Sequence, residues 1–248
     1  MAATSQRVGG GTVANPYTYS VAPDWANRPV NYVSFWDSLR FANWLHNGQG
    51  SSSTETGAYT MGSLGLVGVP TSPPVTHTVG AKYWLPTENE WYKAAYYKGG
   101  GTDSGYWGYT TQSNDFPSNT GSDGYTDPGN SANSAGVAPY YRTKVGEFEN
   151  SASAYGTFDQ GGNVGEWNEA IADQESGITF RGLRGGSFNY PDSIRNAPIG
   201  NDYDYIDPNE ERSDVGFRVA SVPEPGSVTL LVCGATGGLI CYWRRRLR

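Results

Sequence analysis

Apolar residues recur three or four positions apart between residues 34 and 47, which is the spacing of one face of an α-helix. The residues on this face are Phe35, Leu39, Ala42 and Leu45. Ser34 precedes them and Asp37 follows Ser34 by three residues, so the two predict a capping box at the start of the helix. Gly48 marks its predicted end.

A second helix is predicted from Thr87 and Glu90, which have the Thr-x-x-Glu spacing of a capping box. The apolar residues of its buried face are Trp91, Ala94 and Ala95. The helix should end near the glycines at 99–101. Glu88 and Glu90 could instead form an acid/base pair, but we favour capping and stabilisation of the helix dipole, because the cap explains their spacing.

The rest of the chain shows no long periodic segment and no tandem repeat. Glycine, serine and threonine dominate residues 48–80 and 99–135, which predicts long loops. Short strands are predicted from apolar runs at 64–69, 145–148, 181–188 and 215–220. Two helices, scattered short strands and long loops indicate a mixed α+β domain.

Composition narrows the class of protein. The 248 residues carry a net charge of -7, which argues against nucleic acid as a partner because nucleic acid is bound by clustered Lys and Arg. With 34 Gly and 15 Pro, the chain cannot be a long-helix or coiled-coil protein. An aromatic content of 14% excludes a disordered chain and indicates a core built on Trp and Tyr.

Cysteine and histidine are scarce. Cys233 and Cys241 both lie near the C-terminus, so residues 1–232 can hold no disulfide, no thiolate metal site and no cysteine nucleophile. The histidines are His46 and His77, which we interpret as surface or loop residues. Two histidines so placed make a catalytic triad or a histidine-rich metal site hard to assemble.

The C-terminus forms a separate segment. Residues 227–243 carry no charge and are followed by four arginines within 244–248. An uncharged span of this length with a basic flank predicts a transmembrane helix with its arginines in the cytoplasm. The alternative is a buried C-terminal helix, which we consider less compatible with the preceding proline-rich break.

Residues 222–248 resemble the PEP-CTERM sorting signal of exported bacterial proteins. The resemblance rests on Pro223-Glu224-Pro225, the apolar span and the arginine-rich end. It implies a membrane exosortase as processing partner, and a protein of the cell envelope or exterior that the C-terminal helix anchors before processing. The first residues show no apolar signal-peptide core, so we expect either a truncated N-terminus or another export route.

Five segments of the body together resemble the formylglycine-generating enzyme family, also called sulfatase-modifying factor domains. They are VNYVSFWD at 30–37, YWLPTENEW at 83–91, GGNVGEW at 161–167, RGGSF at 184–188 and GFR at 216–218. The resemblance implies an irregular α+β fold related to C-type lectins, often stabilised by calcium. It predicts a domain at 29–221, with an irregular segment at 1–28 before it and the sorting segment at 222–248 after it. An element that is usual at the start of the family's domains is missing from residues 1–28.

The resemblance also argues against the family's oxidase activity. Family members that use oxygen act through two copper-binding cysteines placed shortly after the Gly-Gly-Ser motif. Aligned on that motif, these positions fall at Tyr190 and Arg195, neither of which can bind Cu(I) as a thiolate. Of the family's active-site positions only Ser187 matches, so we expect no copper and no formylglycine formation.

The family's calcium loop is retained better. Its ligand positions fall on Asp159, Gly162, Val164 and Glu166, where two carboxylates and two carbonyls in a glycine-rich loop could surround Ca²⁺. The alternative is that the two acids cap turns. A cluster of four further acidic residues could bind an ion or sugar hydroxyls, although we favour the interpretation that it is a solvated loop. Its members are Asp202, Asp204, Asp207 and Glu210.

Two functions therefore compete. The first is a non-catalytic binding or structural module at the cell envelope. Its groove, lined by Ser187, Tyr190 and Arg195, would hold a glycan or peptide. The second is an enzyme of the same family that uses a cysteine-free site. The scarcity of cysteine and histidine favours the first.

Overall fold

The computed structural model describes residues 5–8, 18–62, 75–119, 127–136, 140–175, 178–190 and 205–222. Several predictions fall outside these ranges. They are the strand at 64–69, the groove residue Arg195, the acidic residues Asp202 and Asp204, and the segment 223–248. In the described ranges, no helix has the length and apolar character needed to cross a bilayer.

Helix α1 spans Phe35–His46 and confirms the first predicted helix. Its N-cap is Ser34, whose hydroxyl accepts from the backbone N–H of Asp37, while the Asp37 carboxylate accepts from the backbone N–H of Ser34. This capping box fixes the start of the helix. Gly48 follows the end with a φ of 89°, a left-handed conformation that glycine adopts without strain.

Helix α2 spans Glu88–Tyr96 and has Thr87 as its N-cap. Glu90 closes the capping box, because its carboxylate accepts from the Thr87 backbone N–H at 2.9 Å. The helix ends before the predicted glycines, because Tyr97 turns to an extended conformation and bridges to Tyr106. Glu88 instead pairs with Arg184, so the two glutamates have different partners and capping explains Glu90.

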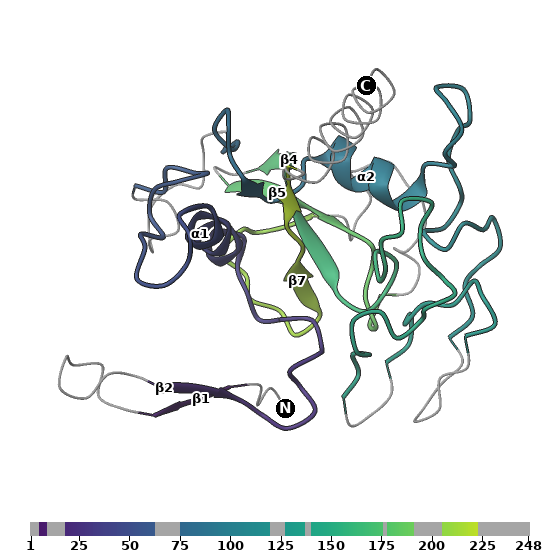
Figure 1. Ribbon diagram of the computed structural model, residues 1–248, viewed down its shortest axis with the longest axis horizontal. Helices are drawn as coiled ribbons and strands as arrows, with labels where there is room; N and C mark the ends of the chain where they lie inside the picture. Colours follow the sequence, from purple (N-terminus) through teal and green to yellow (C-terminus); the bar gives the residue numbers. More distant parts are fainter. Residues whose placement is uncertain are drawn as a thin grey trace, which may run out of the picture.

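Four strands form the central sheet in the order β6-β5-β4-β7. They are β4 (Gly165–Glu175), β5 (Ile178–Arg184), β6 (Tyr205–Ile206) and β7 (Val215–Phe217). Strand β4 pairs antiparallel with β5 and parallel with β7, and a register irregularity follows Trp167 in its pairing with β5. Figure 1 shows this sheet between α1 and α2.

Two smaller sheets complete the strands. Strand β3 (Tyr83–Trp84) pairs with β8 (Ala220–Ser221), and β1 (Ser5–Val8) pairs with β2 (Thr18–Val21). The β1-β2 hairpin extends away from the sheet and the helices at the lower left of Figure 1. The pairing of β3 with β8 joins the start of α2 to the end of the domain.

The sequence prediction was wrong in two strand regions. Residues 145–148 form a turn, because Gly146 has a φ of 74° and the Glu147 N–H donates to the Lys144 carbonyl at 3.2 Å. The predicted strand at 181–188 starts earlier, at Ile178, and stops at Arg184, where Gly185 turns with a φ of 92°. Strand β4 was not predicted at all, and the segment 1–28, which was expected to be irregular, contains the paired strands β1 and β2.

The main core lies between α1 and the sheet. Phe35 of α1 contacts the Trp36 and Trp167 rings edge-on, with centroid separations of 5.2 and 5.9 Å. Trp91, Ala95 and Tyr96 form a second cluster on α2. The core therefore relies on Trp and Tyr, as the composition indicated.

Side chains rather than strands hold the long loops together. Asp127 accepts hydrogen bonds from the backbone N–H of Gly129 and of Asn150 and from the hydroxyl of Ser151. Asn163 similarly accepts from the Thr143 N–H at 3.1 Å. Mixed helices and short strands with long loops confirm the predicted α+β class.

Candidate ligand-binding pocket

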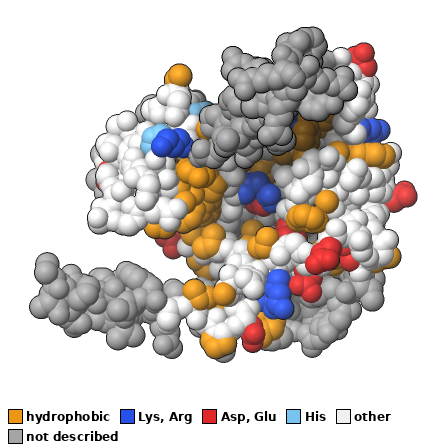
Figure 2. Space-filling view, viewed as in Figure 1, with side chains coloured by type: hydrophobic (Ala, Val, Ile, Leu, Met, Phe, Trp, Pro, Cys, Tyr) orange, Lys and Arg blue, Asp and Glu red, His pale blue; other side chains and the backbone are white. Residues whose placement is uncertain are grey.

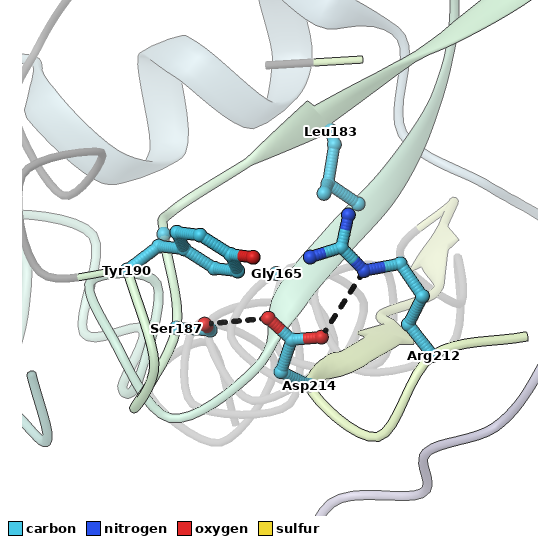
Figure 3. Close-up of a pocket in the computed structure, with 7 residues that line it drawn as sticks. Gly165, Leu183, Ser187, Tyr190, Arg212 and Asp214 are labelled. Carbon is cyan, nitrogen blue, oxygen red and sulfur yellow. Dashed lines mark hydrogen bonds and ion pairs between the residues drawn. The ribbon is translucent and has the colours of Figure 1, made fainter. Parts of the chain in front are cut away.

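Polar side chains from three segments meet in a small pocket beside β4 and β5. Ser187, Tyr190, Arg212 and Asp214 supply its polar groups, and Leu183 gives an apolar wall (Figure 3). The cavity measures about 20 Å³, enough for a water molecule or one small polar group. On the face drawn in Figure 2, basic and acidic side chains meet in a hollow near the centre.

A glycine turn after β5 positions Ser187. Gly185 and Gly186 have φ values of 92° and 62°. A Cβ on Gly185 would lie 2.5 Å from the Gln160 carbonyl oxygen, so only glycine fits this close approach. The turn places Ser187, which is 2% exposed, against the end of the segment that leads into β7.

Asp214 connects the polar groups of the pocket. The Ser187 hydroxyl donates to Asp214 Oδ2 at 3.0 Å, and Arg212 Nε lies 3.4 Å from Asp214 Oδ1. The Arg212 guanidinium also faces the Tyr190 ring, 5.2 Å from its centroid. Figure 3 shows the aspartate between the serine and the arginine, with the tyrosine ring across from the guanidinium.

This arrangement offers hydrogen-bond donors and acceptors. A hydroxyl, a carboxylate, a guanidinium and a phenol surround the cavity, and no residue that the structure describes along its wall is a cysteine or histidine. None of these groups is a soft ligand that would favour Cu(I). The pocket is therefore suited to recognising a polar group.

Two of the three predicted groove residues, Ser187 and Tyr190, lie together in this pocket. The third, Arg195, is outside the described residues. Arg212 and Asp214 were not predicted from the sequence. Both precede the GFR segment that forms β7, and that proximity to a recognised motif was the only sequence signal that could have indicated them.

Glu166, one of the predicted calcium ligands, pairs with an arginine instead. Glu166 is buried, and its two carboxylate oxygens accept from Arg218 Nε and from an Arg218 terminal nitrogen, both at 2.5 Å. Trp91 Nε1 also donates to Glu166, at 2.6 Å. Glu166 is therefore already compensated by a cation of the protein itself.

Asp159 lies near the same arginine and accepts from the Gly146 backbone N–H at 2.6 Å. Burial raises the pKa of Asp159 to about 6, and the nearby Glu166 acts in the same direction, while Gly146 and Arg218 oppose the rise. Gly162 is held against the Asn133 backbone, where a Cβ would lie 2.3 Å from the Asn133 carbonyl oxygen. This packing keeps the loop compact.

Calcium fits these residues only if Arg218 moves away from Glu166. As arranged, the guanidinium fills the position beside the carboxylate that a cation would take. No group of three or more His, Cys, Asp or Glu side chains in the described part of the chain could hold a metal ion. Calcium binding at Asp159, Gly162, Val164 and Glu166 stays a prediction.

A third polar cluster was missed by the sequence analysis. Glu169, on β4, is buried and accepts from the Tyr59 hydroxyl at 2.6 Å and lies 2.7 Å from His77 Nδ1. Burial raises the pKa of Tyr59, and the Glu169 charge adds to the rise. His77 also stacks on Trp84, so this loop histidine ties its segment to the sheet.

Comparison with known proteins places the chain in a family. The sequence profile of the sulfatase-modifying factor enzyme 1-like domain (FGE-sulfatase) matches residues 4–222. That range contains the predicted domain at 29–221 and extends over the segment before it. No curated protein matches the chain.

Solved structures with a similar arrangement include CarF and variable protein 1 of Treponema denticola. CarF is 23% identical, with a TM-score of 0.48 over 81% of this chain and 70% of its own. The Treponema protein is also 23% identical, with a TM-score of 0.44 over 82% of this chain and 74% of its own. From the profile match over most of its length, the chain belongs to the sulfatase-modifying factor enzyme 1-like domain family.

Proposed function

We propose that this protein is a non-catalytic binding module of its family, which holds a polar ligand in the pocket of Ser187, Tyr190, Arg212 and Asp214. One observation carries the proposal. Tyr190, at a position where the family's oxidases have a cysteine, lines a pocket of hydroxyl, carboxylate and guanidinium groups. These groups favour recognition over copper chemistry.

The ligand we infer is a glycan or a peptide. Asp214 is hydrogen-bonded to Ser187 and ion-paired with Arg212. The Arg212 guanidinium is therefore a donor beside the Asp214 carboxylate, an acceptor, and this pair suits a hydroxyl or an amide group. The cavity of about 20 Å³ admits one such group. The remainder of the ligand would lie along the surface, with the Tyr190 ring as an apolar wall.

We also propose that the protein is exported and that an exosortase processes it at the cell envelope. The support is the sequence of residues 222–248, with its Pro-Glu-Pro motif, apolar span and arginine-rich end. Anchoring by this segment would hold the binding pocket outside the cytoplasmic membrane before processing.

The test is to screen the full chain, kept in detergent, against glycan and peptide arrays. A bound ligand should be lost or weakened at least tenfold by Arg212→Gln, since a hydrogen bond to a charged group contributes about 1.5–3 kcal/mol. Arg40→Gln is the matched control, because Arg40 of α1 pairs with Glu55 and is not among the residues that line the pocket. Equal binding by the wild type and Arg212→Gln would contradict the proposal.

The competing enzyme hypothesis gives a different result. An enzyme with a cysteine-free site should convert a ligand from the same array, which mass spectrometry detects as a change in ligand mass. Binding without any mass change supports the binding module. Turnover that Arg212→Gln abolishes would replace it with the enzyme hypothesis.

A further inference from the structure

A second, larger cavity lies where the chain leaves β2. It measures about 270 Å³ and is lined by Trp25, Arg28, Val30, Asn31 and Arg142, among others. This volume approaches the lower end of the range for small-molecule sites. None of its lining residues belongs to the pocket of Ser187 and Asp214.

Two arginines in this cavity are held by aromatic rings and backbone carbonyls. The Arg28 guanidinium lies 3.9 Å from the centroid of the Tyr140 ring, and that of Arg142 lies 4.5 Å from the Trp25 ring. Arg142 donates to the Pro29 carbonyl at 2.6 Å, and Arg28 donates to the Arg142 carbonyl. Stacking and these bonds fix both guanidinium groups without neutralising them.

No carboxylate of the described residues forms an ion pair with either arginine, although Arg142 is only 3% exposed. The acid nearest in sequence, Asp24, accepts instead from the Tyr140 hydroxyl at 3.3 Å and offers Arg28 only its backbone carbonyl. Burial lowers the pKa of Arg142 to about 10, and the positive charge of Arg28 adds to this effect. Two neighbouring cations without a counter-charge favour an anion from outside.

Asn31 adds a hydrogen-bond acceptor to the two guanidinium groups, which can only donate. Its Nδ2 donates to the Ser213 carbonyl at 2.6 Å, which fixes the amide. Its Oδ1 is buried and accepts no hydrogen bond in the structure. A buried acceptor without a donor is costly, so a ligand that brings a hydroxyl to this oxygen would gain from the bond.

We propose that the cavity of Arg28, Asn31 and Arg142 binds a sugar acid, with its carboxylate on the two guanidinium groups and a hydroxyl donating to Asn31 Oδ1. Planar guanidinium groups match a carboxylate with two hydrogen bonds. Trp25 and Val30 would contact the carbon face of the sugar ring. The site is independent of the ligand proposed for the other pocket.

The charge of the site selects against related ligands. A free amino acid has a carboxylate and a donor too, but its ammonium group would be repelled by the two arginines. A neutral sugar offers hydroxyls but nothing to neutralise the guanidinium pair. A simple oxyanion neutralises the pair and leaves Asn31 Oδ1 without a donor.

Isothermal titration of the full chain in detergent with D-glucuronate and D-galacturonate tests the proposal. Either uronate should bind, and glucose, galactose, glutamate and inorganic sulfate should bind at least about tenfold more weakly. The dissociation constant for the uronate should rise when sodium chloride is increased from about 50 mM to about 500 mM, because salt screens the charge pairing. Lack of uronate binding, or equal binding of sulfate or the neutral sugar, overturns the proposal.

Arg28→Gln should weaken uronate binding at least tenfold while circular dichroism shows an unchanged fold, since Arg28 is partly exposed. Asn31→Asp offers a second variant, which should abolish binding because its carboxylate competes for the same guanidinium groups. Arg40→Gln is the control and should bind uronate as the wild type does. Undiminished binding by a folded Arg28→Gln variant also overturns the proposal.

Discussion

Replacing Arg218 with methionine should destabilise the domain by about 3 kcal/mol. The substitution keeps much of the apolar stem and removes the guanidinium that compensates Glu166. The Glu166 side chain is 6% exposed, so its charge would be left buried with only the Trp91 N–H as a donor. Removing one partner of a buried pair costs about 3–5 kcal/mol, and the 25% exposure of the Arg218 side chain favours the lower end.

Urea unfolding followed by circular dichroism measures this loss. Thermal unfolding gives a second measure. For a domain of this size, a loss of 1 kcal/mol lowers the melting temperature by about 2–4 °C, so the melting temperature of the variant should fall by about 6–12 °C. Glu166→Gln should also destabilise, whereas Arg218→Met combined with Glu166→Gln should cost about 2 kcal/mol less than the sum of the two single changes. The exposed pair of Arg40 and Glu55 is the control, since Arg40→Ala should cost less than about 1 kcal/mol.

A small or additive effect would refute this reasoning. If Arg218→Met costs no more than Arg40→Ala, Glu166 does not depend on the guanidinium. If the double variant equals the sum of the single variants within about 0.5 kcal/mol, the two side chains do not interact in solution. Either result would remove the main structural obstacle to calcium at Glu166.

Four further predictions concern charge, metal, the C-terminus and chemistry. Because the pKa of Asp159 is raised to about 6, the folded protein retains a proton that the unfolded chain loses near pH 4, and this stabilisation is lost as the pH rises through about 6. Urea unfolding at pH 5 and pH 7 should show that Asp159→Asn removes about 1 kcal/mol of that pH dependence. Calcium bound at the predicted loop should raise the free energy of unfolding over that of an EGTA-treated sample by about 2.7 kcal/mol at a hundredfold excess over Kd. The Arg218→Met variant should bind calcium more tightly than the wild type. Absence of a heat of calcium binding in calorimetric titrations of both proteins would exclude the site. Truncation after Val222 should leave the melting profile unchanged, and unfolding of the truncated chain would show that the removed segment belongs to the core. With copper, oxygen and a cysteine-containing sulfatase-motif peptide, the peptide mass should stay constant, whereas conversion to the aldehyde above a no-protein control would contradict the non-catalytic proposal.

The helices could be predicted because their signals are local. Ser34 with Asp37, and Thr87 with Glu90, lie within a single turn of the helix each pair begins, and the structure contains both capping boxes. Strand β4 could not be predicted in this way. Its buried face includes Glu166, whose burial depends on Arg218 far along the chain, so a strand search based on apolar alternation misses it.

The pocket was half predictable for a similar reason. Ser187 and Tyr190 follow a glycine motif that can be recognised in the sequence. Arg212 and Asp214 reach the pocket because β7 lies parallel to β4, with Gly165 beside Val215. Parallel pairing joins distant segments through a long connection, and the sequence contains no local sign of it.

The pairing of early and late segments determines when the domain can fold during synthesis. Trp36 Nε1 of α1 donates to Asn209 Oδ1, across 173 residues of sequence, and β3 finds its partner only in β8. Until Ala220 and Ser221 have left the ribosome, Trp84 lacks a neighbouring strand and Glu166 lacks Arg218. A nascent chain should therefore stay open until β8 is available, as contacts between distant segments slow folding. For a protein that we propose is exported, such late closure would keep the chain in a form that a translocation channel can thread.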